Sequence, residues 1–136
     1  MHSAAEFLSI ENIVKSYDSG GRQLAVLSGC DLQVAAGERI AIIGQSGVGK
    51  STLLHLLAGL DRPNSGSIRF CGRELHSLSE PDLATFRGRH VGLVFQFYHL
   101  LPEFTAIENV MMPLLVSGKL HSPSARAASL LADVGL

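Results

Sequence analysis

The chain has little of what marks several large classes of protein. Its 136 residues carry 11 basic and 12 acidic side chains, which gives a formal net charge of −1. A nucleic-acid-binding protein usually carries a strongly basic stripe, so this balance predicts no nucleic-acid partner. The longest apolar stretches, residues 53–60 and 110–116, fall well short of the roughly 20 residues that span a bilayer.

Cysteine is also scarce. Cys30 and Cys71 are too few for a disulfide scaffold, and we expect them to be buried free thiols in a reducing compartment. Hydrophobic residues, in contrast, make up 46% of the chain, which excludes an intrinsically disordered polymer. The length corresponds to one domain with its own apolar core.

Strands are predicted in two settings. Residues 7–17 and 23–34 are rich in β-branched and aromatic side chains, and a glycine-rich turn joins them, which predicts an antiparallel pair. Residues 67–71 alternate and predict a further strand. The continuous apolar runs 39–43 and 91–95 are typical of strands buried on both faces of a parallel sheet.

Helices follow in the middle of the chain. Leucines at helical spacing predict a helix over residues 50–60. Ser79 is a candidate cap for a second helix that extends to about Gly88, with Pro81 in its first turn. The order of strand, loop, helix and strand in this part predicts an α/β core.

Two more helices are expected toward the end. Thr105 and Glu108 fit a capping box, which predicts a helix start. Pro113 is expected to kink or end that helix. Residues 122–123, a serine followed by a proline, are expected to begin the last helix, and Gly135 is its expected stop.

Residues 44–51, Gly-Gln-Ser-Gly-Val-Gly-Lys-Ser, match the pattern G-x-x-x-x-G-K-[ST] at every position. The glycines let backbone N–H groups approach a chain of phosphates, and the expected helix adds its free N–H groups and the positive end of its dipole. Lys50 is the candidate catalytic lysine, placed to contact the β- and γ-phosphates, and Ser51 can bind Mg²⁺ through its hydroxyl. The predicted nucleotide-binding residues are Gly44, Gln45, Ser46, Gly47, Val48, Gly49, Lys50, Ser51 and Thr52.

Two residues outside the loop are further candidates. Tyr17, at the end of the first predicted strand, can stack on a purine; alternatively it is an ordinary sheet residue. Gln96 follows the run 91–95, where such proteins often have an aspartate that helps to hold Mg²⁺. Its amide oxygen can serve a metal ion or a water molecule, so Gln96 is a candidate catalytic residue and metal ligand. The alternative is a polar residue that faces solvent.

The order of Tyr17, the loop 44–51 and Gln96 resembles the ATP-binding subunits of ABC transporters, and the resemblance covers essentially all 136 residues. Residues 53–63 and 95–110 narrow it to the lipoprotein-releasing ATPases and their macrolide-export and cell-division relatives. The resemblance implies an α/β fold. It consists of an antiparallel β subdomain (1–37), a P-loop core (38–96), and a Gln96 loop with the start of a helical subdomain (97–136).

The resemblance also implies how such a protein acts. ATP and Mg²⁺ are the expected cofactors, Tyr17 stacks on adenine, and Gln96 couples the γ-phosphate site to membrane permease subunits. ATP hydrolysis would drive lipoprotein release or export of a related substrate, with a second ATPase subunit as partner. The protein would be cytoplasmic and peripheral on the inner face of the membrane.

The family pattern continues beyond these residues. Its Leu-Ser-Gly-Gly signature, the strand ending in aspartate with a following glutamate, and the switch histidine do not occur in this sequence. We therefore expect the sequence to be the N-terminal part of the domain, incomplete at the C-terminus. As a polypeptide of this length, it should bind ATP but hydrolyse it poorly.

Large apolar side chains crowd the segment 97–112. One interpretation is the core of a helical subdomain, and the other is a groove that receives a helix of the permease, which methionines and aromatics suit. Both interpretations stay open. The residues concerned are Phe97, Tyr98, Leu100, Leu101, Phe104, Met111 and Met112.

Two other functions remain possible from the residues alone. One is a different P-loop NTPase, although the Asn-Lys-x-Asp motif of guanine-specific enzymes is not in the sequence. The other is a non-catalytic regulatory module that binds nucleotide. Competition between ATP and GTP distinguishes the first from an ABC-type site, and binding without turnover favours the second.

Overall fold

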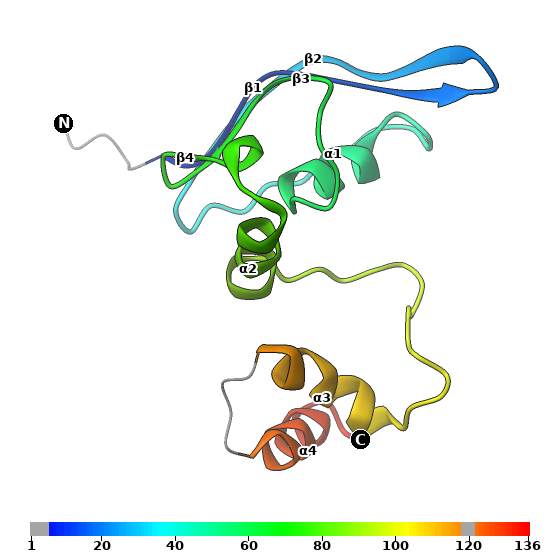
Figure 1. The fold of residues 1–136 in the computed structure, drawn as a ribbon, viewed down its shortest axis with the longest axis vertical. Coiled ribbons are helices and arrows are strands. Elements are labelled where there is room, and N and C mark those ends of the chain that lie inside the picture. The colour runs from blue at the N-terminus through cyan, green and yellow to red at the C-terminus, as the bar shows by residue number, and fades with distance from the viewer. Residues whose placement is uncertain (1–5, 118–121) are drawn as a thin grey trace. The chain divides into compact units, whose positions relative to one another are not determined.

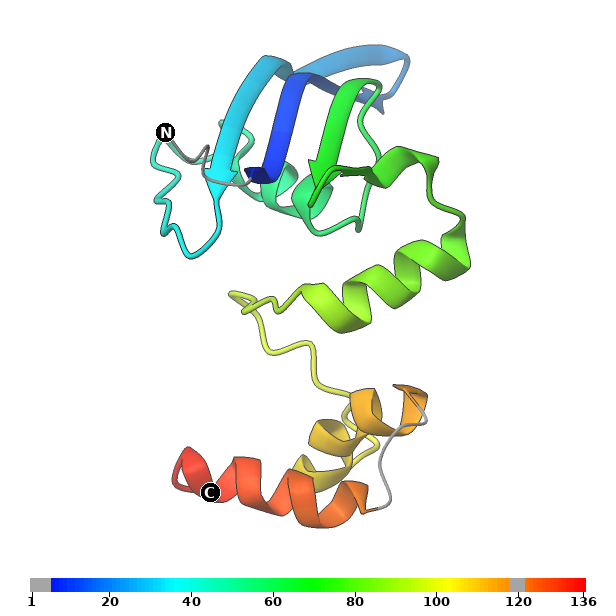
Figure 2. The same ribbon diagram turned by 90° about the vertical axis from the view of Figure 1, so that its left-hand side faces the viewer.

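The computed structural model describes residues 6–117 and 122–136, which form two compact units, Met1–Arg87 and Gly88–Leu136. The figures show each unit as a ribbon (Figures 1 and 2). The first unit contains the sheet and the helix that follows the glycine-rich loop. Its elements are β1 (Glu6–Ser19), β2 (Arg22–Ala35), α1 (Lys50–Leu57), β3 (Ser65–Phe70), β4 (Arg73–Glu74), the 3₁₀ helix η1 (Leu75–Ser77) and most of α2 (Glu80–His90).

The sheet has the strand order β2-β1-β3-β4, and all its neighbouring strands are antiparallel. The pairing of Ser19 with Arg22 closes the hairpin of β1 and β2, and the Gly21 N–H donates to the Asp18 carboxylate at 2.9 Å across the turn. The predicted antiparallel pair and the third strand are therefore confirmed, with shifted ends.

The core of this unit lies between the sheet and α1, which packs against one face of the long strands (Figure 2). Ile10 pairs with Ile68 across β1 and β3, and both are almost completely buried. Each such side chain contributes about 1.5–3 kcal/mol relative to an exposed position. The other buried hydrophobic residues of the unit are Ile13, Leu53, Leu56, Ala58, Leu75, Leu83 and Phe86.

The second unit contains α3 (Ala106–Ser117) and α4 (Pro123–Asp133), which contact each other. The predicted capping box is present: the Thr105 N–H and hydroxyl donate to the Glu108 carboxylate at 2.8 and 2.7 Å, and the Glu108 N–H donates back to the Thr105 hydroxyl at 3.4 Å. The last helix begins at Pro123 as predicted. It ends at Asp133, and Gly135, whose φ is +84°, turns the chain away two residues later, as expected for a helix stop.

The helix ends differ from the predictions in two places. α1 ends at Leu57 rather than residue 60, because Gly59 takes a φ of +66° and the Leu60 N–H turns back to the His55 carbonyl at 2.9 Å. α3 continues through Pro113 to Ser117, so the proline does not end it. Proline removes one backbone donor, and the residues after it keep theirs.

The two predicted buried strands are wrong. Residues 39–43 and 91–95 are irregular, and Ile43 and Val94 are almost fully exposed. A strand needs a hydrogen-bonded neighbour, and neither run pairs with another segment among the residues that the structure describes. The apolar pattern of these runs is typical of a buried strand. Whether such a run pairs with a neighbour and is covered by other elements depends on the tertiary structure.

The cysteines are free, as predicted, but neither is buried. Cys30 is half-buried and Cys71 is exposed, because it sits in the turn between β3 and β4 with a φ of +47°. Within residues 6–117 and 122–136, no helix is long and apolar enough to cross a membrane.

Candidate nucleotide-binding site

The glycine-rich loop leads directly into α1. The Val48 N–H donates to the Gln45 carbonyl at 3.4 Å, and the Leu53 N–H makes the first helical bond, to the Gly49 carbonyl at 2.9 Å. The N–H groups of residues 50–52 therefore have no partner inside the helix. Gly49 caps the helix and has no side chain to accept from them, so these donors suit an external anion.

Gly49 is fixed by its surroundings. Its φ of +101° is strained for other residues, and an added Cβ would lie 3.0 Å from a Val26 methyl carbon and 3.1 Å from the Val26 carbonyl oxygen. Strand β2 thus supports the loop from behind. The preceding residues 44–48 are exposed, so the loop presents its backbone outward.

The Lys50 side chain folds back over its own loop. Its ammonium group donates to the carbonyl oxygens of Gly44 at 2.8 Å and Gln45 at 2.6 Å. These contacts place a positive charge directly above the exposed backbone of the loop. Phosphate oxygens could replace the two carbonyl oxygens as acceptors of the Lys50 ammonium, because an ammonium bonds more strongly to an anionic oxygen than to a neutral one.

The donors available for a metal ion fit Mg²⁺ bound together with a nucleotide. Ser51 is exposed on the first turn of α1 and offers one hydroxyl oxygen. Mg²⁺ is commonly held by one or two protein oxygens, with phosphates and water completing its shell. In the part of the chain that the structure describes, no cluster of His, Cys, Asp and Glu could hold a metal ion alone.

Tyr17 lies beside α1, although sequence reasoning left open an ordinary sheet position. Its hydroxyl donates to Asp61 Oδ2 at 2.8 Å, and its side chain also interacts with Thr52 in the first turn of α1. Partial burial raises the pKa of the Tyr17 phenol, and so do its hydrogen bond to Asp61 and the negative charge there. The residue remains 39% exposed.

Lys15 and Asp61 are functional candidates that sequence reasoning missed. The Lys15 ammonium donates to Asp61 Oδ1 at 2.7 Å and to the Arg62 carbonyl at 2.7 Å, and Lys15 is only 8% exposed. Burial raises the pKa of Asp61, but hydrogen bonds from Lys15, Tyr17 and the Arg62 N–H outweigh it and hold that pKa below its usual value. One sequence signal could have found Lys15. It lies two residues from Ile13 on the same predicted strand, so it shares the inward face of an apolar residue and needs an anionic partner there.

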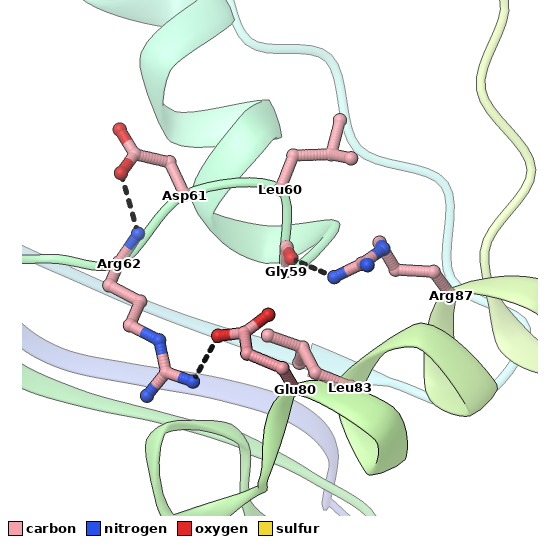
Figure 3. Close-up of a pocket in the computed structure, with 7 residues that line it drawn as sticks. All are labelled: Gly59, Leu60, Asp61, Arg62, Glu80, Leu83 and Arg87. Atoms are coloured by element: carbon pink, nitrogen blue, oxygen red, sulfur yellow. Dashed lines mark hydrogen bonds and ion pairs between the residues drawn. The ribbon is translucent and has the colours of Figure 1, made fainter.

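A pocket of about 190 Å³ lies next to this group, between the loop that follows α1 and the face of α2 that carries Glu80, Leu83 and Arg87 (Figure 3). The Arg62 guanidinium pairs with Glu80 at 2.7 Å, and the Arg87 guanidinium donates to the Gly59 carbonyl at 2.8 Å. These bonds fix the loop that carries Asp61. The pocket is lined by Gly59, Leu60, Asp61, Arg62, Glu80, Leu83 and Arg87.

The remaining candidates lie in the second unit. Gln96 is exposed, and its relation to the loop stays a prediction. The structure therefore brings together residues 44–52 and Tyr17 from the predicted site, and it adds Lys15 and Asp61.

A glycine-rich loop that ends in a lysine and opens a helix is the phosphate-binding arrangement of P-loop NTPases. The sequence profile of the ABC transporter family matches residues 27–136, and the chain belongs to this family. The predicted family resemblance is thus confirmed.

Within this family, the chain is similar to lipoprotein-releasing system ATP-binding proteins. The chain is 53% identical over 133 residues to the lipoprotein-releasing system ATP-binding protein LolD of Geobacter metallireducens, which covers 97% of this chain and 59% of that protein. It is also 53% identical over 131 residues to LolD of Pseudomonas syringae pv. tomato, which covers 95% of this chain and 57% of that protein.

Among solved structures, the fold matches the dimeric ATP-binding cassette MJ0796 in a post-hydrolysis state bound to ADP and phosphate. The TM-score is 0.85 at 31% identity, over 93% of this chain and 56% of that chain. The predicted fold class is therefore confirmed as that of an ABC cassette. The chain spans a little more than half the length of these relatives.

Proposed function

We propose that the chain is the nucleotide-binding part of an ABC transporter ATPase and holds ATP through residues 44–52. The observation that carries this proposal is the loop itself: exposed backbone, uncapped N–H groups at the start of α1, and the Lys50 ammonium 2.8 Å from the Gly44 carbonyl. Backbone donors and one mobile charge are what a triphosphate requires.

Each predicted residue has a role in this proposal. Lys50 contacts the β- and γ-phosphates and stabilises the charge that develops during transfer, and Ser51 holds Mg²⁺, which supplies charge neutralisation between the phosphates when bound. Tyr17 stacks on adenine. Gln96 contributes its amide oxygen to the metal ion or the attacking water molecule, and so serves as catalytic residue and metal ligand.

In the whole protein, ATP hydrolysis would drive lipoprotein release or export of a related substrate through membrane permease subunits. The names of the relatives support the lipoprotein assignment. The dimeric MJ0796 cassette supports a second ATPase subunit as partner. Such a protein would act in the cytoplasm, on the inner face of the membrane.

The permease contact is proposed for the segment 97–112 of the second unit. Phe97 is 71% exposed and Tyr98 is 91% exposed, so these side chains are available to an apolar partner. In the assembled complex, Tyr98→Ala and Leu101→Ala should weaken permease binding and permease-stimulated turnover. Unchanged values for both variants would reject this segment as the contact.

The 136-residue polypeptide by itself should turn ATP over very slowly. Its sequence holds no signature motif and no strand that ends in Asp-Glu, so nothing in it positions and polarises the attacking water as the family pattern requires. Turnover at the rate of an intact transport ATPase would contradict this expectation. A non-catalytic nucleotide-binding module would behave in the same way, and only the whole protein distinguishes the two.

The direct test of nucleotide binding is calorimetric titration of Mg-ATP into the parent chain and the variant Lys50→Ala. Loss of a charge-assisted contact should weaken binding about 10- to 100-fold. The matched control is Arg73→Ala, which removes the same charge from an exposed residue of the edge strand β4. Equal affinity for ATP in the parent and Lys50→Ala would reject the site, and GTP competing as well as ATP would reject the adenine preference.

A further inference from the structure

We propose that Asp61 and Lys15 are positioning residues that hold the Tyr17 ring for stacking on the nucleotide base. This inference rests on the proposed function. It assigns a role to a pair outside the loop 44–51: Lys15 lies on β1, and Asp61 lies in the loop that follows α1.

The two carboxylate oxygens of Asp61 accept hydrogen bonds from different residues. Oδ1 accepts from the Lys15 ammonium at 2.7 Å, and Oδ2 accepts from the Tyr17 hydroxyl at 2.8 Å. The same Lys15 ammonium lies 4.8 Å from the centroid of the Tyr17 ring. The phenol is therefore fixed at its tip by the carboxylate and at one face by the cation.

The contacts follow from the strand. Lys15 and Tyr17 are two residues apart on β1, so their side chains project from the same side of the sheet. Lys15 is buried, and a buried ammonium requires a paired anion. Asp61 is thus held in place by Lys15 regardless of Tyr17, and Tyr17 receives an acceptor whose position is already set.

The loop that carries Asp61 is anchored separately. The Arg62 guanidinium pairs with Glu80 at 2.7 Å and donates to the His76 carbonyl at 3.1 Å. The Asp61 carboxylate and the Arg62 guanidinium point to opposite sides of the loop, while the Arg62 N–H bonds to Asp61 (Figure 3). The carboxylate is therefore free to face Lys15 and Tyr17.

A ring held in this way does not have to be ordered when the nucleotide binds, and this lowers the entropic cost of stacking. Because the Lys15 ammonium covers one face of the ring, the opposite face is the one on which a base can stack. The contribution concerns only the base, since neither Asp61 nor Lys15 contacts the loop 44–49.

The test compares two ligands, ATP and inorganic tripolyphosphate, each with Mg²⁺, in calorimetric titrations of the 136-residue chain. Asp61→Asn and Tyr17→Phe each disrupt the bond between phenol and carboxylate. Each should weaken ATP binding about 3- to 10-fold and leave tripolyphosphate binding unchanged. The double variant should bind ATP no more weakly than the more affected single variant, because both substitutions remove the same hydrogen bond between Tyr17 and Asp61.

The matched control is Glu11→Gln, which neutralises another carboxylate of the same unit, one that pairs with Arg69 and contacts neither Tyr17 nor the loop that carries Asp61. It should leave the ratio of ATP to tripolyphosphate affinity as in the parent. Equal loss of both ligands in Asp61→Asn would overturn the proposal, since it would mark Asp61 as purely structural. No loss in Asp61→Asn and Tyr17→Phe would overturn it as well.

A spectroscopic measurement keeps the proposal testable if Asp61→Asn folds poorly. The chain has two tyrosines and no tryptophan, so Tyr17 is the sole strong emitter in a Tyr98→Phe background. Removing its anchor with Lys15→Met should increase the amplitude of fast ring motion in time-resolved anisotropy. Unchanged anisotropy would overturn the proposal. Failure of the nucleotide site is distinguishable, since Lys50→Ala would then leave both ligands unaffected.

Discussion

In the first unit, apolar side chains from the strands β1 and β3 and the helices α1, η1 and α2 form the core, and Ile10, Ile13 and Ile68 are each at most 1% exposed. In the second unit, among the described residues, the buried hydrophobic side chain is Ala127, and α3 has none. Large apolar side chains such as Tyr98 and Val116 instead face outward. The first unit therefore has the packing that holds a binding site, and the second offers surface.

This difference explains where precise geometry is found. The phosphate loop is supported by β2 from behind, and Tyr17 is tied to Asp61 on an anchored loop. A site needs such support because small displacements of its donors weaken it strongly. Mutations should therefore affect the two units differently, most of all where a core side chain is removed.

Truncation of a core side chain should separate the units most clearly. Ile13→Ala removes a fully buried side chain from β1 and should cost about 2–5 kcal/mol, through lost burial and the cavity that remains. Leu100→Ala, at an exposed position of the second unit, should cost less than about 0.5 kcal/mol. Hydrogen exchange of the backbone amides in each unit provides the measurement. Similar losses for both variants would remove the contrast.

A pair of glycines provides the second comparison. Gly49 and Gly135 both have positive φ, but an added Cβ at Gly49 meets β2 at 3.0 Å and one at Gly135 meets nothing within 4 Å. Gly135→Ala should cost about 1–2 kcal/mol from its backbone conformation alone. Gly49→Ala should cost roughly 1–3 kcal/mol more, because β2 must shift. Urea denaturation of both variants tests this order, and the reverse order would show that β2 does not constrain the loop.

The second unit has one polar anchor of its own. The Asn109 side chain accepts from the Leu101 N–H at 2.9 Å and donates to the carbonyls of Leu101, Phe104 and Thr105 at 3.0–3.1 Å. Asn109→Ala should cost about 1 kcal/mol of local stability. The effect should appear as faster exchange of the Leu101 and Phe104 amides.

Asn109→Asp is the matched control for that prediction, since it keeps the acceptor and loses the donors. It should protect the Leu101 amide more than Asn109→Ala does. ATP binding by the first unit should be the same in both variants, and altered binding would show that the loop 101–105 affects the nucleotide site.

The smallest effect concerns pH. Hydrogen bonds from the Thr105 hydroxyl and N–H lower the pKa of Glu108, and the pKa of Asp61 is also lowered, against the opposing effect of its burial. A carboxylate whose pKa is lower in the folded state stabilises the fold fully above its unfolded pKa, and this contribution is lost as the pH falls from the unfolded pKa through the lower folded pKa.

Carboxyl titrations by NMR test the two groups separately. Thr105→Ala should return the pKa of Glu108 only partway to its ordinary value, because the variant loses the hydroxyl donor and keeps the backbone N–H of residue 105. Tyr17→Phe should raise the pKa of Asp61 only in part, since Lys15 remains bonded to it. A complete return for Asp61 would show that Tyr17, and not Lys15, holds this carboxylate.

Local chemistry could be predicted from the sequence. The loop 44–51, the capping box at Thr105 and the stop at Gly135 each depend on neighbouring residues and their preferred dihedral angles. For the same reason the strands of the hairpin and the leucine stripe of α1 were found with small errors at their ends. The strands predicted at 39–43 and 91–95 were wrong because an apolar run indicates which side chains favour burial. It does not indicate whether a neighbouring strand is present to pair with it.

The sequence by itself determined that the chain has the glycine-rich pattern G-x-x-x-x-G-K-[ST] at the start of a helix, since consecutive residues supply every part of it. Only the tertiary structure decided which other side chains join that loop. Lys15 and Asp61 lie 46 residues apart in the chain, yet their charges meet at 2.7 Å and fix Tyr17. Such a contact is set by how β1 and the loop after α1 pack, and pairing over that distance leaves no local pattern in a single sequence.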